Sequence, residues 1–312
     1  MTQPSTDFDT PSQQKVFAAR LSIMSNALLV LLKLLVGIWS GSISILSEAF
    51  HSASDLLASG IALMAVRIAE VPPDDEHPYG HGKAESLSGL AEALLIFVAA
   101  GYIFYEAIHK LLTPVHSVHT SVDIGIGVMA FSAILNTFLS RYLFRVAQQT
   151  DSVALYADAE HLRTDVYTSV GVLVGLMLVR LTDIAWFDPV TALFVAILIL
   201  KTTYHLAHKA LQLLLDVRLP DSEVQTIREI LKSDERVMDF HQLRTRKSGA
   251  HRYADVHVLI EDQSTLVEAH DLTEELEDKI RAALSSMHIN IHIEPYHAEV
   301  EHQRKAHGRY LP

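Results

Sequence analysis

The stretch Ser47–Asp55, SEAFHSASD, decides the fold, because it places His51 four residues before Asp55 inside a segment apolar enough to cross a bilayer. The segment Ala159–Asp165, AEHLRTD, repeats this His-x-x-x-Asp pattern. Positions i and i+4 of a helix share one face, about 6 Å apart along the axis. Each segment therefore offers an imidazole and a carboxylate that point the same way, and two such faces brought together predict a metal site with four ligands.

Ionisable groups at membrane depth are costly, so they are usually buried inside a helix bundle and functional. One such motif alone is more typical of polar residues at a helix end or of a hydrogen-bonded pair, but two copies on separate candidate spans favour a metal site. Neutral imidazoles and carboxylates suit a tetrahedral divalent cation, with zinc the first choice. The predicted ligands are His51, Asp55, His161 and Asp165.

Composition bounds the class of protein. The chain has 312 residues, of which 49% are hydrophobic and 20% charged, and its mean hydropathy is +0.22. These values are typical of a polytopic membrane protein with a soluble part. The absence of Cys leaves His, Asp and Glu as metal ligands, and the net charge of −12 argues against nucleic acid as a partner.

The sequence predicts six membrane spans between two polar tails, 1–15 and 299–312, which are expected to be disordered. Each span is long enough to cross about 30 Å of hydrocarbon at 1.5 Å per residue. The predicted spans are Val16–Trp39, Ile43–Ala69, Glu85–Leu112, Val122–Leu143, Ala154–Leu181 and Trp186–Tyr204. The last continues as an amphipathic helix through Leu215, so that the membrane domain occupies 16–215.

Six spans place both termini on one side of the membrane, and the basic residues indicate which side. The flanks on the terminal side carry eight Lys or Arg, against Lys110 and Arg180 on the other: Lys15, Arg20, Arg67, Lys83, Arg141, Arg145, Lys209 and Arg218. The positive-inside rule therefore predicts cytoplasmic termini. With this topology, Asp55 and Asp165 both lie about eleven or twelve residues from the start of their spans, near the middle of the membrane.

Residues 216–298 read as a small cytoplasmic α+β domain. Helices are expected over Asp221–Lys232, with Asp221 or Ser222 as N-cap, and over Leu266–Leu284. Strands are expected at Met238–Lys247, Tyr253–Glu261 and Ile289–Ile293. The order αββαβ predicts an antiparallel or mixed sheet with helices on one face.

Two further clusters of metal-ligand residues lie outside the spans. Asp74, His77 and His81 occupy a loop rich in Pro and Gly, where they form either an open, exchangeable metal site or a set of solvated loop residues. In the soluble domain, His292 and Glu294 share one face of a strand. They are grouped with three other candidates on neighbouring elements, which are either further ligands or isolated surface residues: His241, His257 and His270.

Five sequence stretches together resemble the cation diffusion facilitator family of proton-coupled zinc exporters, especially its bacterial members. They are SEAFHSASD, DDEHPYGHGKAES, AEHLRTD and the pair HQLRTRKSG with HIEP, and the resemblance extends from Leu21 to about Pro295. It implies six transmembrane helices, a metallochaperone-like cytoplasmic domain, a homodimer in the inner membrane and export of zinc in exchange for protons.

The resemblance also implies roles for the clusters. The transport site would be His51, Asp55, His161 and Asp165; the loop site Asp74, His77 and His81; and the regulatory binuclear zinc site His241, His257, His270, His292 and Glu294. Some bacterial members carry Asp in place of His51, a change linked with broader acceptance of cadmium or iron, so His favours zinc here. Members often carry Asp in place of Glu294, whose side chain is one methylene longer.

Three alternatives stay open at the level of sequence. The same mechanism could serve iron, cadmium or manganese. A membrane metalloenzyme would need an open coordination position and a general base, often as HExxH, and the sequence contains no HExxH. A zinc sensor or storage protein would not require ligand pairs at mid-membrane.

Overall fold

A computed structural model of the chain describes residues 10–40, 43–112, 122–182 and 186–307. The chain forms two compact units, Met1–Leu211 and Gln212–Pro312. The boundary falls within the sixth long helix, which runs without a break from the predicted span into the amphipathic extension.

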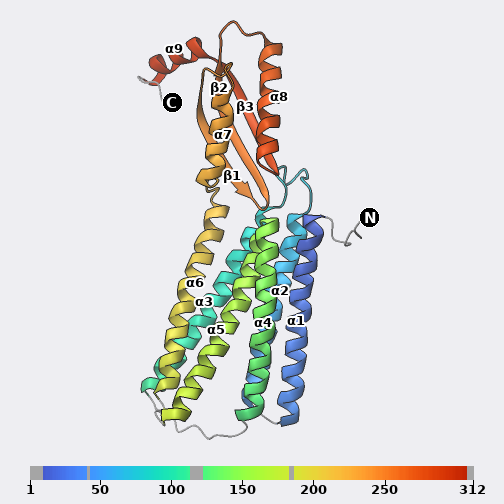
Figure 1. Cartoon of the computed structure of the whole chain (residues 1–312), viewed down its shortest axis with the longest axis vertical. Helices are drawn as coiled ribbons and strands as arrows, with labels where there is room; N and C mark the ends of the chain where they lie inside the picture. Colours follow the sequence, from blue (N-terminus) through green and yellow to red (C-terminus); the bar gives the residue numbers. More distant parts are fainter. Residues whose placement is uncertain (1–9, 41–42, 113–121, 183–185, 308–312) are drawn as a thin grey trace, which may run out of the picture. The chain divides into compact units, whose positions relative to one another are not determined.

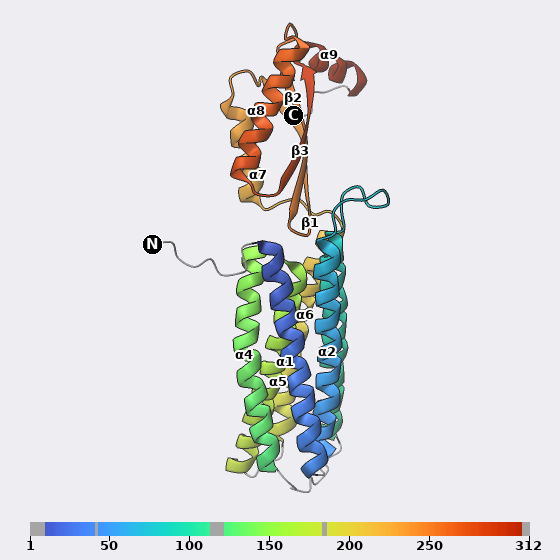
Figure 2. The same cartoon turned by 90° about the vertical axis from the view of Figure 1, so that its right-hand side faces the viewer.

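The first unit is a bundle of six long helices that run alongside one another (Figures 1 and 2). Their bounds are α1 Pro11–Ser40, α2 Ile43–Ala69, α3 Lys83–Leu112, α4 Val122–Thr150, α5 Val153–Thr182 and α6 Phe187–Leu214. The helix α2 packs against α1, α3 and α5, and α5 also packs against α4. The two helices that carry the His-x-x-x-Asp motifs are therefore direct neighbours.

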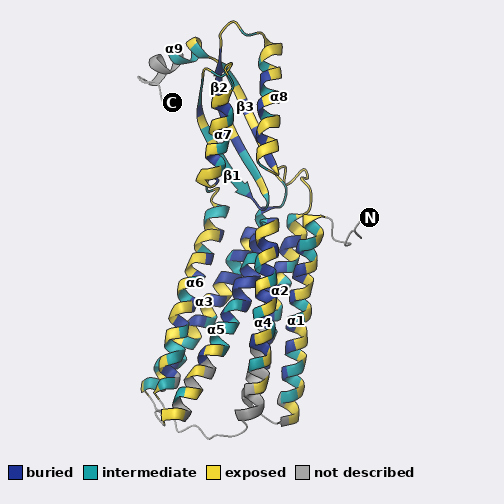
Figure 3. Ribbon diagram, viewed as in Figure 1, coloured by how far each residue is buried: buried dark blue, intermediate teal, exposed yellow. Residues whose placement is uncertain are grey.

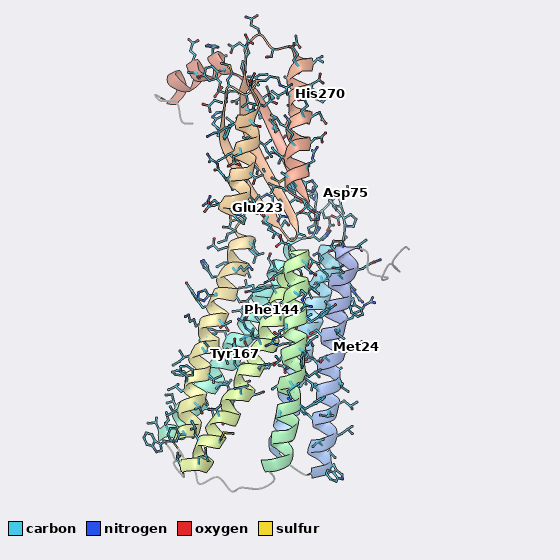
Figure 4. All side chains as sticks on the ribbon, in the orientation of Figure 1. Met24, Asp75, Phe144, Tyr167, Glu223 and His270 are labelled. Atoms are coloured by element: carbon cyan, nitrogen blue, oxygen red, sulfur yellow. The ribbon has the colours of Figure 1, made fainter. Side chains whose placement is uncertain are left out.

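Figure 3 shows buried residues where the helices of the bundle face one another and exposed residues along their outer sides. Many of the exposed side chains are large and apolar, whereas the buried positions hold both apolar and polar residues. Large apolar side chains on α1 are exposed in a stripe that includes Met24, Leu28 and Leu35, and Met24 is labelled in Figure 4. Buried positions carry many polar residues, such as Ser59 and Asn136. An exposed apolar belt of this kind fits a lipid environment.

By length and composition alone, three described segments qualify as membrane spans: Pro11–Val36, Lys83–His109 and Pro189–Leu214. The motif-bearing helices α2 and α5 are not among these three segments, and both carry ionisable residues in their middle turns.

Small residues let the helices approach closely. One buried cluster joins Ala18 and Ala19 of α1 to α2, α4 and α5, and another joins Ala93 and Ala100 of α3 to Ala157 of α5 and to α6. Alanine-rich contacts allow the short interhelical distances that van der Waals packing in membranes requires. This packing fixes the rotation of α2 and α5, and hence the direction of their polar faces.

A buried ion pair ties four helix ends together. Lys15 Nζ forms an ion pair with Glu70 and lies 3.2 Å from Glu85 Oε1. The other oxygen of Glu85 accepts hydrogen bonds from Ser152 Oγ at 2.6 Å and from the backbone N–H of Val153 at 2.8 Å, at the start of α5. The expected disordered tail is therefore wrong for residues 11–15, which belong to α1 because Lys15 is held inside the bundle.

The second unit has the element order that the sequence predicts, αββαβ, followed by one more helix. Its elements are α7 Asp221–Ser233, β1 Asp239–Ser248, β2 His251–Ile260, α8 Leu266–Ala283, β3 Met287–Pro295 and α9 Tyr296–His307. The sheet order is β1-β2-β3, with β1 and β2 antiparallel and β2 and β3 parallel. The sheet is thus mixed, one of the two predicted forms.

The core of this unit lies between one face of the sheet and the helices α7 and α8. Alternate residues of β3, Met287, Ile289 and Ile291, are buried against Leu272 and Leu276 of α8. Because strand side chains alternate, the intervening residues lie on the opposite face. That face carries the histidines.

Two local expectations are corrected. The N-cap of α7 is Pro220 rather than Asp221 or Ser222, because Asp221 is already helical. Residues 299–307, expected to be disordered, continue the helix α9. At its start, the backbone N–H of His297 donates to Asp262 at 2.8 Å.

Candidate metal sites

The first candidate site lies inside the membrane bundle, between α2 and α5. One carboxylate oxygen of Asp55, the imidazole of His161 and one carboxylate oxygen of Asp165 all lie within 4.8 Å of one another. Asp55 Oδ1 is 3.1 Å from His161 Nε2. Asp55 is 5% exposed and His161 8% exposed. The two sequence motifs therefore meet, as their depth predicts.

The fourth predicted ligand, His51, belongs to α2, one turn before Asp55. Its side chain lies outside the described residues. An i, i+4 spacing on a continuous helix places it on the same face as Asp55, so His51 stays a predicted ligand.

The donor set suits a divalent cation. Two carboxylates and a neutral imidazole carry a net charge of −2, which a cation such as zinc would neutralise. Within the described residues, Nδ1 of His161 is buried without a hydrogen-bond partner. The arrangement offers protein ligands from two neighbouring helices.

The second candidate site is the loop between α2 and α3. Asp74 Oδ1 lies 3.3 Å from His77 Nδ1, and Asp74 Oδ2 lies 3.5 Å from His81 Nε2. The two imidazole rings are 4.4 Å apart. Gly80, between them, has φ +77°, a left-handed conformation that strains other residues. All three predicted loop ligands thus come together.

The loop holds Asp74 in its ionised form. The backbone N–H groups of His77 and Glu76 donate to Asp74 Oδ1 at 2.6 and 3.1 Å. The hydrogen bond from the His77 N–H is the main reason why the pKa of Asp74 lies below its ordinary value. Asp74 and His77 are both about half exposed, so this is an open site.

The third candidate site lies on the face of the sheet opposite the core formed with α7 and α8. His241, His257 and His292 occupy one row across β1, β2 and β3, because His241 pairs with His257 and His257 pairs with His292. Glu294, two residues after His292, lies beside this row. Its carboxylate oxygens are 2.7 Å from His241 Nε2 and 2.8 Å from His257 Nδ1. His292 Nε2 is 3.5 Å from Glu294 Oε1.

Backbone irregularity next to the row turns His241 inward. The pairing of β1 and β2 shifts between His241 and Arg244, and Gln242 has φ +51°. A bulge of this kind re-aims the side chains beside it. His241 is buried, whereas His292 is exposed.

The hydrogen bonds also set the charge of Glu294. Partial burial is the largest single influence and favours the protonated carboxyl. The hydrogen bonds from His241 and His257 outweigh it and hold the pKa of Glu294 below its ordinary value. A metal-ligand carboxylate between two imidazoles is therefore already ionised.

His270 is the predicted ligand that this chain alone does not bring to the row. It lies on α8 and is exposed (Figure 4). Within the described residues, the group that could hold a metal consists of His241, His257 and Glu294, with His292 beside it.

Two buried carboxylates of the membrane bundle, Glu92 on α3 and Asp158 on α5, were not predicted from the sequence as candidate site residues. Both are fully buried. The signal was present, because an ionisable residue in a membrane span needs a functional explanation, and Asp158 precedes His161 by one helical turn.

A buried cluster of carboxylates and imidazole inside an apolar helix bundle, joined to an α+β unit with a second, partly exposed cluster, is typical of a membrane transporter of metal cations. The chain belongs to the cation efflux family. Residues 19–215 match the cation efflux transmembrane domain, and residues 219–296 match the cation efflux protein cytoplasmic domain. It is a divalent-cation efflux transporter and not an enzyme, which removes the metalloenzyme alternative.

Relatives with similar sequences cover most of the chain. An uncharacterized transporter of Synechocystis sp. is 36% identical over 82% of this chain and 82% of its own length. The cation-efflux pump FieF of Salmonella paratyphi A is 35% identical over 89% of this chain and 91% of its own length. The solved metal-bound C-terminal domain of the CzcD transporter from Thermotoga maritima is 20% identical, covers 25% of this chain and 95% of that chain, and has a TM-score of 0.24.

Proposed function

We propose that this transporter exports zinc from the cytoplasm in exchange for protons, through a site formed by His51, Asp55, His161 and Asp165. The observation that carries the proposal is the buried cluster of Asp55, His161 and Asp165 on neighbouring helices. A mixed set of imidazole and carboxylate ligands with few open positions favours zinc over magnesium or calcium, which prefer all-oxygen sites.

Proton coupling follows from the ligand chemistry. An imidazole has an unperturbed pKa of about 6.5 and binds a metal only when it is neutral. Zinc binding from the cytoplasm therefore releases protons, and protonation from the other side helps to expel the ion. The carboxylates of Asp55 and Asp165 balance the charge of whichever cation is present. Alternating exposure of one site to the two faces then couples the zinc and proton gradients.

Six membrane spans, an inner-membrane location and cytoplasmic termini belong to the same proposal. The basic flanks on the terminal side of the helices support this orientation. The match of residues 219–296 to the cytoplasmic domain of cation efflux proteins supports a homodimer that meets cytoplasmic metal.

The histidine row would be a regulatory zinc site. His241, His257, His292 and Glu294 would hold the metal, and the ionised carboxylate between two imidazoles fits such an ion. When bound, the metal supplies positive charge that joins ligands from all three strands. His270, exposed on α8, would ligate from a position that this chain alone does not bring to the row. Asp74, His77 and His81 would form an exchangeable site at the membrane surface.

Iron, cadmium or manganese efflux is the competing substrate assignment. The discriminating experiment is calorimetry of the four metals on the wild type and on His51→Asp. Zinc preference in the wild type with a gain of cadmium affinity in the variant would support the zinc proposal. Tighter binding of iron or manganese than zinc by the wild type would contradict it.

Transport itself is tested in proteoliposomes that contain the purified full chain and a trapped pH indicator. A zinc gradient should drive proton movement in the opposite direction. Asp151→Asn serves as control, because Asp151 lies in the turn between α4 and α5 and Asn tolerates its left-handed backbone. Zinc flux in the wild type without proton movement would contradict antiport. A zinc sensor or storage protein would show no flux.

A further inference from the structure

Glu92 of α3 and Asp158 of α5 are two membrane carboxylates that the metal site does not use. Each is 0% exposed. They interact electrostatically with each other, and both interact with His161. Neither lies within ion-pair distance of a described Lys or Arg.

Asp158 is held by neutral hydroxyl groups. Ser59 Oγ, on α2, donates to Asp158 Oδ1 at 3.0 Å. Asn26 Nδ2, on α1, donates to that same Ser59 Oγ at 2.7 Å, and Ser22 Oγ, also on α1, lies 3.2 Å from Ser59 Oγ. The second oxygen, Oδ2, is buried and has no hydrogen-bond partner among the described residues.

Glu92 is held even less. Ser88 Oγ, one turn earlier on α3, donates to Glu92 Oε1 at 3.4 Å. Glu92 Oε2 is buried without a hydrogen-bond partner in the described part of the chain. Each carboxylate thus keeps one oxygen to which no donor among the described residues hydrogen-bonds.

The helices α1, α2 and α5 contribute the other polar and titratable groups around the pair. The helix α2 contributes Asp55, which interacts with Asp158, and α5 contributes His161. From α1 come the neutral side chains of Ser22 and Asn26. The nearby charge is therefore mainly negative whenever the metal site is empty.

Two buried carboxylates that have no Lys or Arg partner among the described residues cannot both stay ionised while His161 is neutral. Burying an uncompensated carboxylate costs several kcal/mol, and a second like charge nearby adds to that cost. Protonation of one member removes the repulsion and supplies an O–H donor for an oxygen that lacks one. Such a pair titrates as a unit.

We propose that Glu92 and Asp158 form a proton-binding site, separate from the metal ligands, that holds one proton while the metal site is empty and releases it when a divalent cation binds. The O–H bond of the protonated carboxyl breaks, and the proton passes to water on the side from which the metal enters. The pair then carries two negative charges, which the bound cation stabilises. This inference rests on the proposed antiport and specifies one of its proton carriers.

The position of the pair supports this coupling. Asp158 lies three residues before His161, toward the start of α5 and the buried pair of Lys15 and Glu85. A cation between Asp55 and His161 therefore lies within electrostatic reach of Asp158, and the interior of a bundle screens that interaction weakly.

The test is the number of protons moved per zinc ion in proteoliposomes that contain the full chain. Glu92→Gln and Asp158→Asn keep the shape of each side chain and remove its charge. Each should transport zinc with about one proton fewer than the wild type. Glu106→Gln, the same substitution further along α3, should keep the wild-type ratio. A wild-type ratio in both variants of the pair would overturn the proposal.

Failure of the proposed antiport can be distinguished from failure of this proton-site proposal, because it would appear in the wild type as zinc flux without proton flux. If a variant folds poorly, infrared spectroscopy of the wild type at pH 7, with and without zinc, tests the proposal without it. A carbonyl band of a protonated carboxylic acid should be present without zinc and disappear on zinc addition, and Glu92→Asp should retain it. A wild-type spectrum that lacks this band, or keeps it unchanged with zinc, would also overturn the proposal.

Discussion

In the membrane bundle, Asp55 and His161 are 5% and 8% exposed and come from helices, at positions four residues from a second ligand. In the Gln212–Pro312 unit, the side chain of His241 is 1% exposed but that of His292 is 61% exposed, and the ligands come from three strands whose register aligns them. Both regions use imidazole and carboxylate donors. They differ in their access to water.

This difference in access to water indicates how the same ligand chemistry can suit both transport and sensing of a metal. A buried cluster of charges must be neutralised by metal or protons, so every change of occupancy has a large energetic consequence. A cluster that includes an exposed ligand such as His292 can exchange its ion with the solvent at a smaller cost. The buried site therefore suits transport coupled to protons, and the exposed site suits sensing of metal concentration.

We expect the largest effect on transport when one carboxylate is removed from the membrane site. Asp55→Asn and Asp165→Asn should lower the zinc transport rate about 10²- to 10³-fold, because removing one partner of a buried charged cluster costs about 3–5 kcal/mol. Zinc flux into proteoliposomes measures the effect, and Asp151→Asn should transport normally. Flux within a few-fold of the wild type in either variant would show that the buried cluster is not the transport site.

The buried ion pair of Lys15 and Glu85, at the helix ends, should show the next largest effect on substitution. Glu85→Gln removes the charge that Lys15 and the start of α5 share, and should destabilise the protein by about 2–3 kcal/mol. Thermal unfolding in detergent, compared with Glu106→Gln as control, measures the loss. An unchanged unfolding midpoint would mean that this buried ion pair does not hold the bundle together.

The exposed cluster should respond more gently. Glu294→Gln should raise the zinc concentration for half-maximal transport about tenfold, which is about 1.4 kcal/mol, while the maximal rate stays near the wild-type value. Substitution of His241 or His292 should act in the same way. A fall in maximal rate equal to that of Asp55→Asn would remove the distinction between the two sites.

The pH dependence of the second unit provides a smaller effect. Because the pKa of Glu294 in the folded unit lies below its ordinary value of 4.5, its ionised form contributes stability above that pH. The contribution, about 1 kcal/mol, is lost as pH falls through the folded pKa. Hydrogen exchange of β3 in the metal-free full chain should show a difference between wild type and Glu294→Gln near pH 6 that shrinks below pH 4.5. A difference that grows in acid would contradict this sign.

The loop site should show the smallest effect. Asp74→Ala leaves a half-exposed pair of imidazoles, and should lower the zinc affinity of the full chain for one site by about threefold without changing maximal transport. Calorimetry with Glu76→Ala as a matched control measures this change. A loss of transport would move the loop from an exchangeable site into the transport path.

The sequence predicted the parts that periodicity and motif spacing control. The pair of His-x-x-x-Asp motifs predicted the approach of Asp55 and His161, because mid-membrane depth can be counted along a helix. The element order of the second unit was equally accessible from β-branched strands and an amphipathic helix. The cation efflux family that the motifs resemble is confirmed by both domain matches.

Tertiary contacts decided the rest. Hydropathy did not show that Lys15 turns inward to Glu85, so α1 begins earlier than expected. The alignment of His241, His257 and His292 depends on strand register and a bulge, and neither is visible in residue order. The burial of Glu92 and Asp158, each 0% exposed, depends on how α3 and α5 pack and was not predicted from the sequence.

The most direct test of the central account is an anomalous diffraction map of the zinc-loaded full chain, collected at the zinc absorption edge. We expect one peak in the membrane bundle, bounded by Asp55, His161 and Asp165, that disappears in Asp55→Asn. Peaks confined to the loop and to the second unit, with no ion between α2 and α5, would contradict the account.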